Sequence, residues 1–200
     1  MYLSVSTITA ILISNFATAT ATATTTATAK VIHLSDLNGT FIERQVQHPN
    51  GSLVNVYLRD SYKSPLGSVD SLDKRFHKTY HDGNHTEICA ETNFVDTSTL
   101  ESALCSDCSA IITELKANPG FFETGDYTDN EYNYLTVCGS CAFGVHRTDG
   151  LSSRVDIGSK DVIDNINSAL IRFSVDDHVG ATGNFTCNSA PINWAILKAA

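Results

Sequence analysis

The amino-acid sequence predicts an α+β fold, a two-layer sandwich in which two helices pack on an antiparallel sheet held by disulfides. Three observations lead to this fold class. All six cysteines lie at or after Cys89, two segments show helical spacing of apolar residues, and strand-like segments surround them without a regular βαβ alternation. The 200 residues are enough for one domain with a substantial core.

The first helix is expected from Leu104 to Leu115, because apolar residues recur there every three or four positions. The stretch Asn118-Pro-Gly120 ends it, since proline and glycine do not continue a helix. The second helix is expected from Ser159, as its N-cap, to Phe173, with Asp161 favourably placed in the first turn. One face of this helix is apolar and comprises Val162, Ile163, Ile166, Leu170 and Phe173.

Strands are expected where β-branched and aromatic residues gather or alternate with polar ones. The expected strands are Tyr134–Val145, Arg154–Ile157, Val179–Cys187 and Ile192–Leu197, with one more at Leu53–Leu58. From these patterns we place Phe143, Ile166, Phe173 and Trp194 in the core.

The N-terminal part of the chain predicts secretion. The first 29 residues contain no Lys, Arg, Asp or Glu, and a short apolar run precedes small-x-small sites at residues 17–21. We therefore expect a signal peptide at residues 1–20, a Thr/Ala-rich and polar linker or pro-region at 21–87, and the folded domain at 88–200. The sequence contains no uninterrupted run of 18 apolar residues, so we expect no membrane-spanning helix in the mature protein.

Secretion predicts two kinds of modification. The glycosylation tripeptide Asn-x-Ser/Thr begins at Asn38, Asn50, Asn84 and Asn184. The pair Lys74-Arg75 lies in a polar stretch where processing enzymes could cut, which would start the mature chain at Phe76. An ordinary solvated basic pair is the alternative interpretation.

The charge of the chain narrows the class of partner. The formal net charge is −9, and only 18% of residues are charged. Nucleic acids and anionic membranes select Lys-rich and Arg-rich surfaces, so neither is expected as the main partner.

Three chemistries fit the cysteines of the stretch VCGSCAFGV at residues 137–145. A papain-type nucleophile is excluded, because it needs a His and an Asn roughly 130–150 residues downstream, and only 59 residues follow Cys141. Zinc would suit two Cys-x-x-Cys pairs, but it requires reduced thiolates and secreted chains meet an oxidising environment. Disulfides remain. The sequence does not choose among pairings; we favour Cys89–Cys187, Cys108–Cys141 and Cys105–Cys138, the last two as neighbouring rungs.

Other candidate sites are weaker. His77, His81 and His85 are spaced by four, as metal ligands on a helix would be, but Gly83 interrupts the helix and a solvated flexible tail is favoured. No catalytic, metal-binding or cofactor-binding residue is assigned. The Asp-rich loops Tyr127–Glu131 and Asp176–His178 are the candidate binding loops, since loops on a rigid frame carry recognition.

The last 110 or so residues resemble a family of secreted fungal effectors of the extracellular-protein-2, necrosis-inducing type. The resemblance rests on an ordered series of short motifs. They are Cys89 with Thr92-Asn-Phe94, Asp107-Cys108, Cys141-Ala-Phe-Gly-Val145, Val155-Asp-Ile-Gly158, Asp161-Val-Ile-Asp164, Val179-Gly-Ala-Thr-Gly183, Cys187 and Ile192-Asn-Trp194. Cys105 and Cys138 are additional to the four cysteines usual in the family, and their joint presence is what an extra bridge would look like. Phe121-Phe122 stands where the family often has Trp.

The resemblance implies a compact sandwich similar to that of a virus-encoded fungal killer toxin, with no cofactor and no catalytic residues. Members of the family are linked to host cell death. We therefore expect a secreted, non-enzymatic, monomeric effector that binds a host protein or cell-surface target, in a plant, and promotes cell death. Two alternatives remain open. One is an antimicrobial, killer-toxin-like protein that acts on competing microbes, and the other is a small hydrolase with a carboxylate pair.

Overall fold

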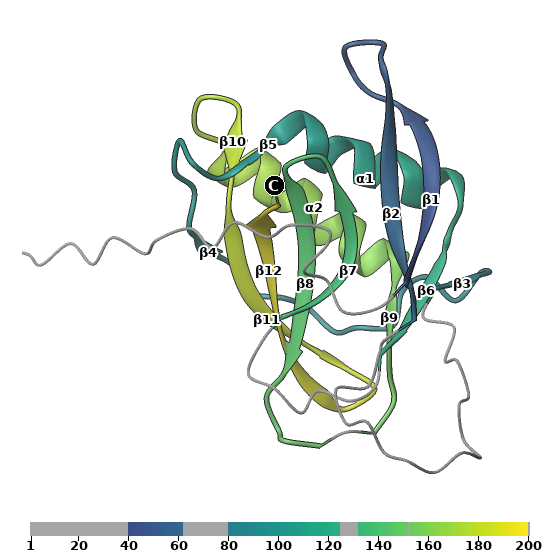
Figure 1. Ribbon diagram of the computed structural model, residues 1–200. Coiled ribbons are helices and arrows are strands. Elements are labelled where there is room, and N and C mark those ends of the chain that lie inside the picture. The colour runs from purple at the N-terminus through teal and green to yellow at the C-terminus, as the bar shows by residue number, and fades with distance from the viewer. Residues whose placement is uncertain (1–39, 62–79, 125–131, 152, 200) are drawn as a thin grey trace, which may run out of the picture.

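The computed structural model describes residues 40–61, 80–124, 132–151 and 153–199. A seven-stranded antiparallel sheet has the strand order β1-β2-β7-β8-β12-β11-β4. These strands are β1 (Thr40–Gln47), β2 (Leu53–Ser61), β7 (Asn133–Cys138), β8 (Cys141–Arg147), β12 (Ala190–Lys198), β11 (Ala181–Cys187) and β4 (Val95–Asp96). Helices α1 (Cys105–Ala117) and α2 (Ser159–Phe173) lie together on one face of this sheet (Figure 1).

Two smaller sheets complete the layer of helices. Strands β3 (Tyr80–Asp82), β6 (Gly120–Thr124) and β9 (Val155–Gly158) form one sheet, and β5 (Ala103–Leu104) pairs with β10 (His178–Val179) in the other. The predicted fold class, an α+β sandwich with two helices on an antiparallel sheet, is confirmed.

Both predicted helices are present, with one difference at the start of α2. Gly158, rather than Ser159, is the N-cap residue. The Gly158 N–H donates to the Asp161 carboxylate at 3.0 Å. The Ser159 hydroxyl instead accepts a hydrogen bond from the Gly120 N–H at 3.1 Å, which joins α2 to β6.

The expected strand Tyr134–Val145 is two strands, because residues 139–140 form a tight turn between β7 and β8. Gly139 has φ +49°, a conformation that glycine adopts without strain. The Asp107 carboxylate accepts hydrogen bonds from the Ser140 N–H at 2.8 Å and the Ser140 hydroxyl at 2.7 Å. A Cβ at Gly139 would lie 2.6 Å from that carboxylate, so this close approach also favours glycine.

The core between sheet and helices is centred on Trp194. Its ring stacks on Phe143 with centroids 5.9 Å apart, and the edge of Phe94 meets it at 5.1 Å. The indole N–H donates to the Thr92 hydroxyl at 2.7 Å, so the one polar atom of the ring is satisfied. Trp194, Phe143 and Ile166 are fully buried, as predicted. Phe173 is only half-buried and packs at the margin of the core.

We expected residues 21–87 to be a linker or pro-region. For residues 40–61 the structure shows that this is wrong. These residues form the β1–β2 hairpin, and β2 pairs with β7 through Val56↔Cys138, Tyr57↔Val137 and Leu58↔Thr136. Val56 and Leu58 are fully buried on the helix side of the sheet. The predicted strand at Leu53–Leu58 is confirmed, whereas β1 was not expected.

Polar contacts also fix the hairpin to helix α1. Arg44 forms ion pairs with Glu114 at 3.2 Å and with Asp82 at 3.1 Å. At the hairpin turn, His48 Nε2 lies 3.4 Å from Asp107 Oδ1. Because Glu114 is only 2% exposed, the Arg44 guanidinium compensates a buried carboxylate. The hairpin is therefore part of the folded unit in this structure.

A pair of leucines in β2 tests whether the hairpin contributes to stability. Leu58→Ala is expected to lower the free energy of unfolding by about 2–4 kcal/mol, because it removes a fully buried side chain. Leu53→Ala, in the same strand but 69% exposed, is the matched control and should change it by less than about 0.5 kcal/mol. Urea unfolding of the oxidised protein measures both. Equal small effects would mean that the hairpin is not part of the cooperative fold.

Candidate functional site

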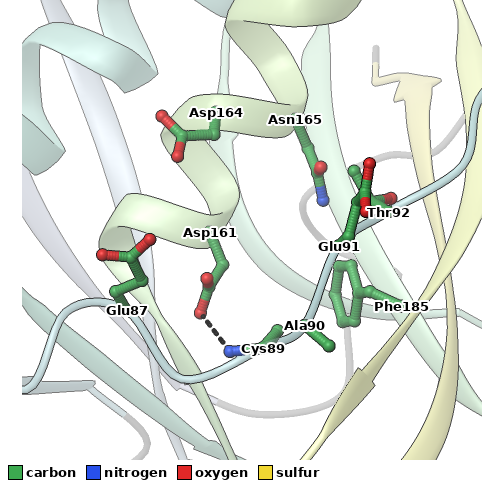
Figure 2. A pocket seen from close by; sticks show the side chains of 9 residues that line it. All are labelled: Glu87, Cys89, Ala90, Glu91, Thr92, Asp161, Asp164, Asn165 and Phe185. Carbon is green, nitrogen blue, oxygen red and sulfur yellow. Dashed lines mark hydrogen bonds between the residues drawn. The ribbon is translucent and has the colours of Figure 1, made fainter.

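A cleft of about 200 Å³ lies between helix α2, the segment before β4, and strand β11. Four of its nine lining residues are acidic, although apolar atoms make up most of the exposed lining. It comprises Glu87, Cys89, Ala90, Glu91, Thr92, Asp161, Asp164, Asn165 and Phe185. Figure 2 shows that Asp161, Asp164 and Asn165 come from the first turns of α2, whereas residues 87–92 run past them as an extended segment.

Asp161 forms the centre of the cleft. One carboxylate oxygen accepts hydrogen bonds from the N–H groups of Ile88 at 3.0 Å, Cys89 at 3.1 Å and Gly158 at 3.0 Å. Burial raises the pKa of this carboxyl, and the three amide hydrogen bonds oppose the rise. Asp161 therefore caps α2 and at the same time holds the extended segment against the helix.

One end of the cleft is neutralised within the protein. The Lys160 ammonium lies 2.6 Å from Asp164 and 3.3 Å from Glu87. Its hydrogen bond to Asp164, followed by that to Glu87, raises the pKa of Lys160. All three groups are exposed, so the pairs are solvated and contribute little to stability.

Asn165 lies at the other end of the cleft and is 2% exposed. Its Nδ2 group has no hydrogen-bond partner in the part of the chain that the structure describes. Figure 2 shows the amide directed from α2 toward the segment that carries Glu91 and Thr92. A buried donor without a partner is rare in native proteins, which makes this atom the most informative one in the cleft.

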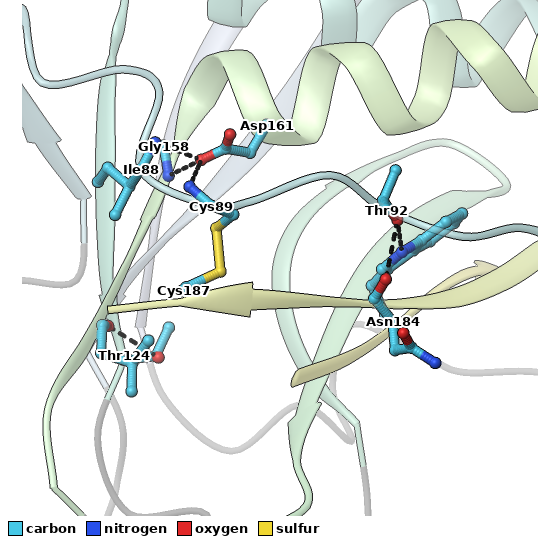
Figure 3. The surroundings of a disulfide bond; sticks show 10 residues. Ile88, Cys89, Thr92, Thr124, Gly158, Asp161, Asn184 and Cys187 are labelled. Atoms are coloured by element: carbon cyan, nitrogen blue, oxygen red, sulfur yellow. Dashed lines mark hydrogen bonds between the residues drawn. A yellow bond between two sulfur atoms is a disulfide. The ribbon is translucent and has the colours of Figure 1, made fainter. Parts of the chain in front are cut away.

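The Cys89–Cys187 disulfide joins the extended segment to the end of β11 (Figure 3), and Cys89 is one of the residues that line the cleft. The two cysteines also form an isolated antiparallel bridge. Further along, the Ala90 N–H donates to Thr186 O at 2.8 Å and the Asn93 N–H to Asn184 O at 3.1 Å. The wall of the cleft is thus fixed by covalent and backbone contacts.

The second disulfide, Cys108–Cys141, links α1 to the start of β8. Both bridges have the pairing that we favoured from the sequence. The third expected bridge, Cys105–Cys138, is absent, and both cysteines are free thiols. Cys141, the residue that resembles a catalytic cysteine in sequence, is therefore not a thiol.

The positions of the two free cysteines explain why the third bridge does not form. Cys105 starts α1 beside Ser174 and Asp177, on the side of the helix that faces the end of α2. Cys138 lies at the end of β7 beside Asp107 and is 1% exposed. The two thiols therefore have different neighbours, Cys105 at the end of α2 and Cys138 at the β7–β8 turn, and it is Cys108 that bridges α1 to β8.

Of the two candidate binding loops, Tyr127–Glu131 lies outside the described residues. The other, Asp176–His178, is a tight turn in which Asp176 and Asp177 have φ of 47° and 63°. Asp177 O accepts the Cys105 N–H at 2.8 Å. The turn therefore holds the start of α1, and neither of its aspartates lines the cleft.

The histidine series also differs from its expectation. His81 is in β3 rather than in a flexible tail, and its ring stacks on Phe121 at 4.8 Å while Nε2 lies 3.1 Å from Glu123. His85 contacts the edge of the same ring at 5.7 Å. Phe122, the other half of the aromatic pair, fills a fully buried position. His77 is outside the described residues.

The described part of the chain contains no group of three or more His, Cys, Asp or Glu side chains suited to a metal ion. Within that same part, no helix combines the length and apolar character needed to cross a membrane. The side chains of Asn50, Asn84 and Asn184 are exposed and therefore accessible to glycosylation, which stays a prediction. Asn38, the processing pair Lys74-Arg75 and the expected signal peptide lie outside the described residues.

The cleft was not predicted, because its residues come from three separate segments. The sequence signal that could have found it is Asp161, which was assigned to the first turn of a helix but not to the capture of a second segment. Asn165, one turn further along, carries a polar side chain on the buried side of that helix. A buried polar residue among apolar ones marks a site worth testing.

Comparison with known proteins gives a family match over residues 88–187, half of the chain. The family is Hce2, described as "Pathogen effector; putative necrosis-inducing factor". The matched region includes both disulfides, both helices and every residue of the cleft except Glu87. The β1–β2 hairpin precedes it.

A curated relative is "Probable chitinase LysM18" of Penicillium expansum, 26% identical over 114 residues. The match covers 54% of this chain but only 8% of the relative. This chain is thus similar to one small region of a much longer protein.

Thiol labelling tests the cysteine assignment. Unfolded without reductant, the protein should expose two thiols per chain, which mass spectrometry after alkylation counts. In the native protein at pH 8, Cys105 should react before Cys138, because burial raises the pKa of Cys138 to about 12 and covers its sulfur. Cys105→Ser should remove the faster reaction alone. No reactive thiol in the unfolded chain would instead establish the third bridge.

Proposed function

Since this chain belongs to the Hce2 family of pathogen effectors, we propose that it is secreted and acts by binding a target on or in a host plant cell, where it promotes cell death. The observation that carries this proposal is the family match across the whole disulfide-linked region. Two disulfides suit an oxidising, extracellular environment. The effector class is the common property of the family, whereas the plant host and cell death are our proposals for this chain.

Binding without catalysis is supported by what the carboxylates do. Asp161 accepts three backbone N–H groups, Asp107 holds the β7–β8 turn, and Glu114 pairs with Arg44. Each of these groups is engaged in a structural contact, and this includes Asp161, which lines the cleft but has one carboxylate oxygen bound by three backbone N–H groups. We therefore propose that the protein is not an enzyme and that its activity depends on a rigid surface.

The cleft is the best-supported place for such binding. Its walls are held by the Cys89–Cys187 bridge and by the three hydrogen bonds to Asp161, so little conformational freedom is lost when a partner binds. The acidic lining favours a neutral or basic partner. A rigid acidic cleft on the surface gives the proposed effector a specific docking site.

A second candidate function is action on competing microbes. The observation that favours it is the similarity of this chain to a region of a protein named as a probable chitinase, because chitin is a wall polymer of fungi. On this alternative the domain would bind microbial wall glycans, as an antimicrobial, killer-toxin-like protein. The two candidates differ in the organism on which the protein acts.

Leaf infiltration tests the main proposal. The purified, oxidised full-length protein should cause cell death in leaves, scored by ion leakage. A reduced and alkylated sample should cause none, because the walls of the cleft and the α1–β8 link depend on the disulfides. The paired replacement Cys89→Ser with Cys187→Ser should also reduce the response strongly, since it releases the extended segment.

Two outcomes would contradict the main proposal. A response that is equal for the oxidised and the alkylated samples would show that the folded domain is not the active species. No response in several plant hosts, together with growth inhibition of competing fungi, would favour the second candidate. Release of sugars from cell-wall glycans by the protein would overturn the non-enzymatic assignment.

A further inference from the structure

We infer that the acidic cleft binds a saccharide unit that carries an amine or an acetamide group beside its hydroxyls. This inference deepens the proposed function by giving the cleft a ligand class, and it rests on the proposal that the protein acts by binding. Three features of the cleft support it: an unsatisfied buried donor, one carboxylate without an ion pair, and the size of the space between them.

The unsatisfied donor is Asn165 Nδ2. The side chain is 98% buried, and its NH₂ group has no partner among the described residues. Leaving such a donor unpaired costs free energy. Because Nδ2 has less than 1 Å² of accessible surface, a ligand oxygen would have to displace a neighbouring side chain to reach it, and would then remove that cost. The ligand must therefore present an acceptor, such as a hydroxyl or acetamide oxygen, at the end of the cleft where Asn165 lies (Figure 2).

The unpaired acceptor is the carboxylate of Glu91. Lys160 forms ion pairs with Glu87 and Asp164. Glu91 has no ion pair among the described residues, and it is exposed at the rim of the cleft beside Asn165. A carboxylate accepts hydrogen bonds only, so it selects ligand O–H or N–H groups. Its negative charge selects against phosphate-bearing or uronic-acid ligands and in favour of a protonated amine.

A hexosamine unit combines these requirements. Each sugar hydroxyl can donate to a carboxylate and accept from an amide, and the amine or acetamide adds a further donor close by. The cleft of about 200 Å³ has room for a small polar unit but not for a secondary-structure element. Phe185 and Ala90 give it an apolar wall against which the carbon face of a sugar ring can lie.

Titration of the full-length, oxidised protein followed by NMR tests the inference. The probes are tetrasaccharides of glucosamine, of N-acetylglucosamine and of glucose, the last of which lacks nitrogen. We expect the two amino sugars to shift the amide signals of residues 87–92 and 161–165, and the glucose tetramer to bind at least tenfold more weakly. Preference for the glucosamine form that fades with salt would identify the ammonium as the recognised group, and preference for the N-acetylated form would identify the acetamide.

Two variants locate the site. Asn165→Ala removes the buried donor, and Glu91→Gln removes the rim charge with little change in shape; each should weaken binding about tenfold, as expected for one hydrogen bond within a polar site. Glu101→Gln, an exposed carboxylate outside the cleft, is the matched control and should bind as the wild type does. Because Glu91 is at the surface, its replacement tests the site even if Asn165→Ala fails to fold.

The results separate this inference from the proposed function. No shift with any amino sugar at millimolar concentration, equal binding of the glucose tetramer, or unchanged binding by Glu91→Gln would overturn the saccharide assignment. Cell death in leaves that survives such a result would leave the proposed function intact. Conversely, amino-sugar binding by a protein that causes no cell death would support the cleft and contradict the host-directed proposal.

Discussion

The structure depends most on the place where Asp161 and the Cys89–Cys187 disulfide meet. One carboxylate oxygen gathers three backbone N–H groups from two segments, and the disulfide ties one of those segments to β11 over a sequence separation of 98 residues. The Lys160 N–H adds a hydrogen bond to Thr86 O at 2.9 Å. The start of α2, the extended segment and the sheet edge therefore have one fixed arrangement, and the cleft lies along it (Figures 2 and 3).

This junction has a close steric fit as well. A Cβ at Gly158 would lie 1.9 Å from Thr86 O, so a side chain at this position would separate the extended segment from the helix. Closing so long a loop by a covalent link stabilises the fold by about 4–5 kcal/mol on the loop-entropy model. The Asp161 carboxylate, the Cys89–Cys187 bridge and Gly158 therefore act at the same point of the fold.

The β1–β2 hairpin lies outside the matched region but not outside the fold. It lengthens the main sheet by two strands and covers α1, where Arg44 compensates the buried Glu114. Because the hairpin contributes buried residues such as Leu58, removing it would expose both β7 and part of α1. Any processing after Arg75 would therefore separate two pieces of chain that are packed together in the structure.

Sequence patterns predicted the two helices and the buried Trp194 well, because apolar periodicity reports directly on one buried face. They did not predict β1, whose alternation is weakened by the adjacent apolar pair Phe41-Ile42 and by Arg44, a residue that is polar yet packed. The predicted Cys105–Cys138 bridge was wrong, because equal spacing in the sequence does not show which neighbours each cysteine has in the fold: Cys105 lies beside Ser174 and Asp177, and Cys138 beside Asp107. The cleft stayed hidden because Glu91, Asn165 and Phe185 meet only in three dimensions.

Backbone hydrogen exchange of the full-length protein, compared with its Asp161→Ala variant, tests the central role of this junction most directly. The amides of Ile88, Cys89, Ala90 and Asn93 are hydrogen-bonded and should be protected in the wild type. We expect the variant to lose much of this protection while the β7–β8 amides keep theirs, because the carboxylate holds the extended segment and the start of α2 and has no hydrogen bond to that hairpin. Unchanged protection across residues 88–93 would show that the disulfide is sufficient and that Asp161 does not organise the cleft.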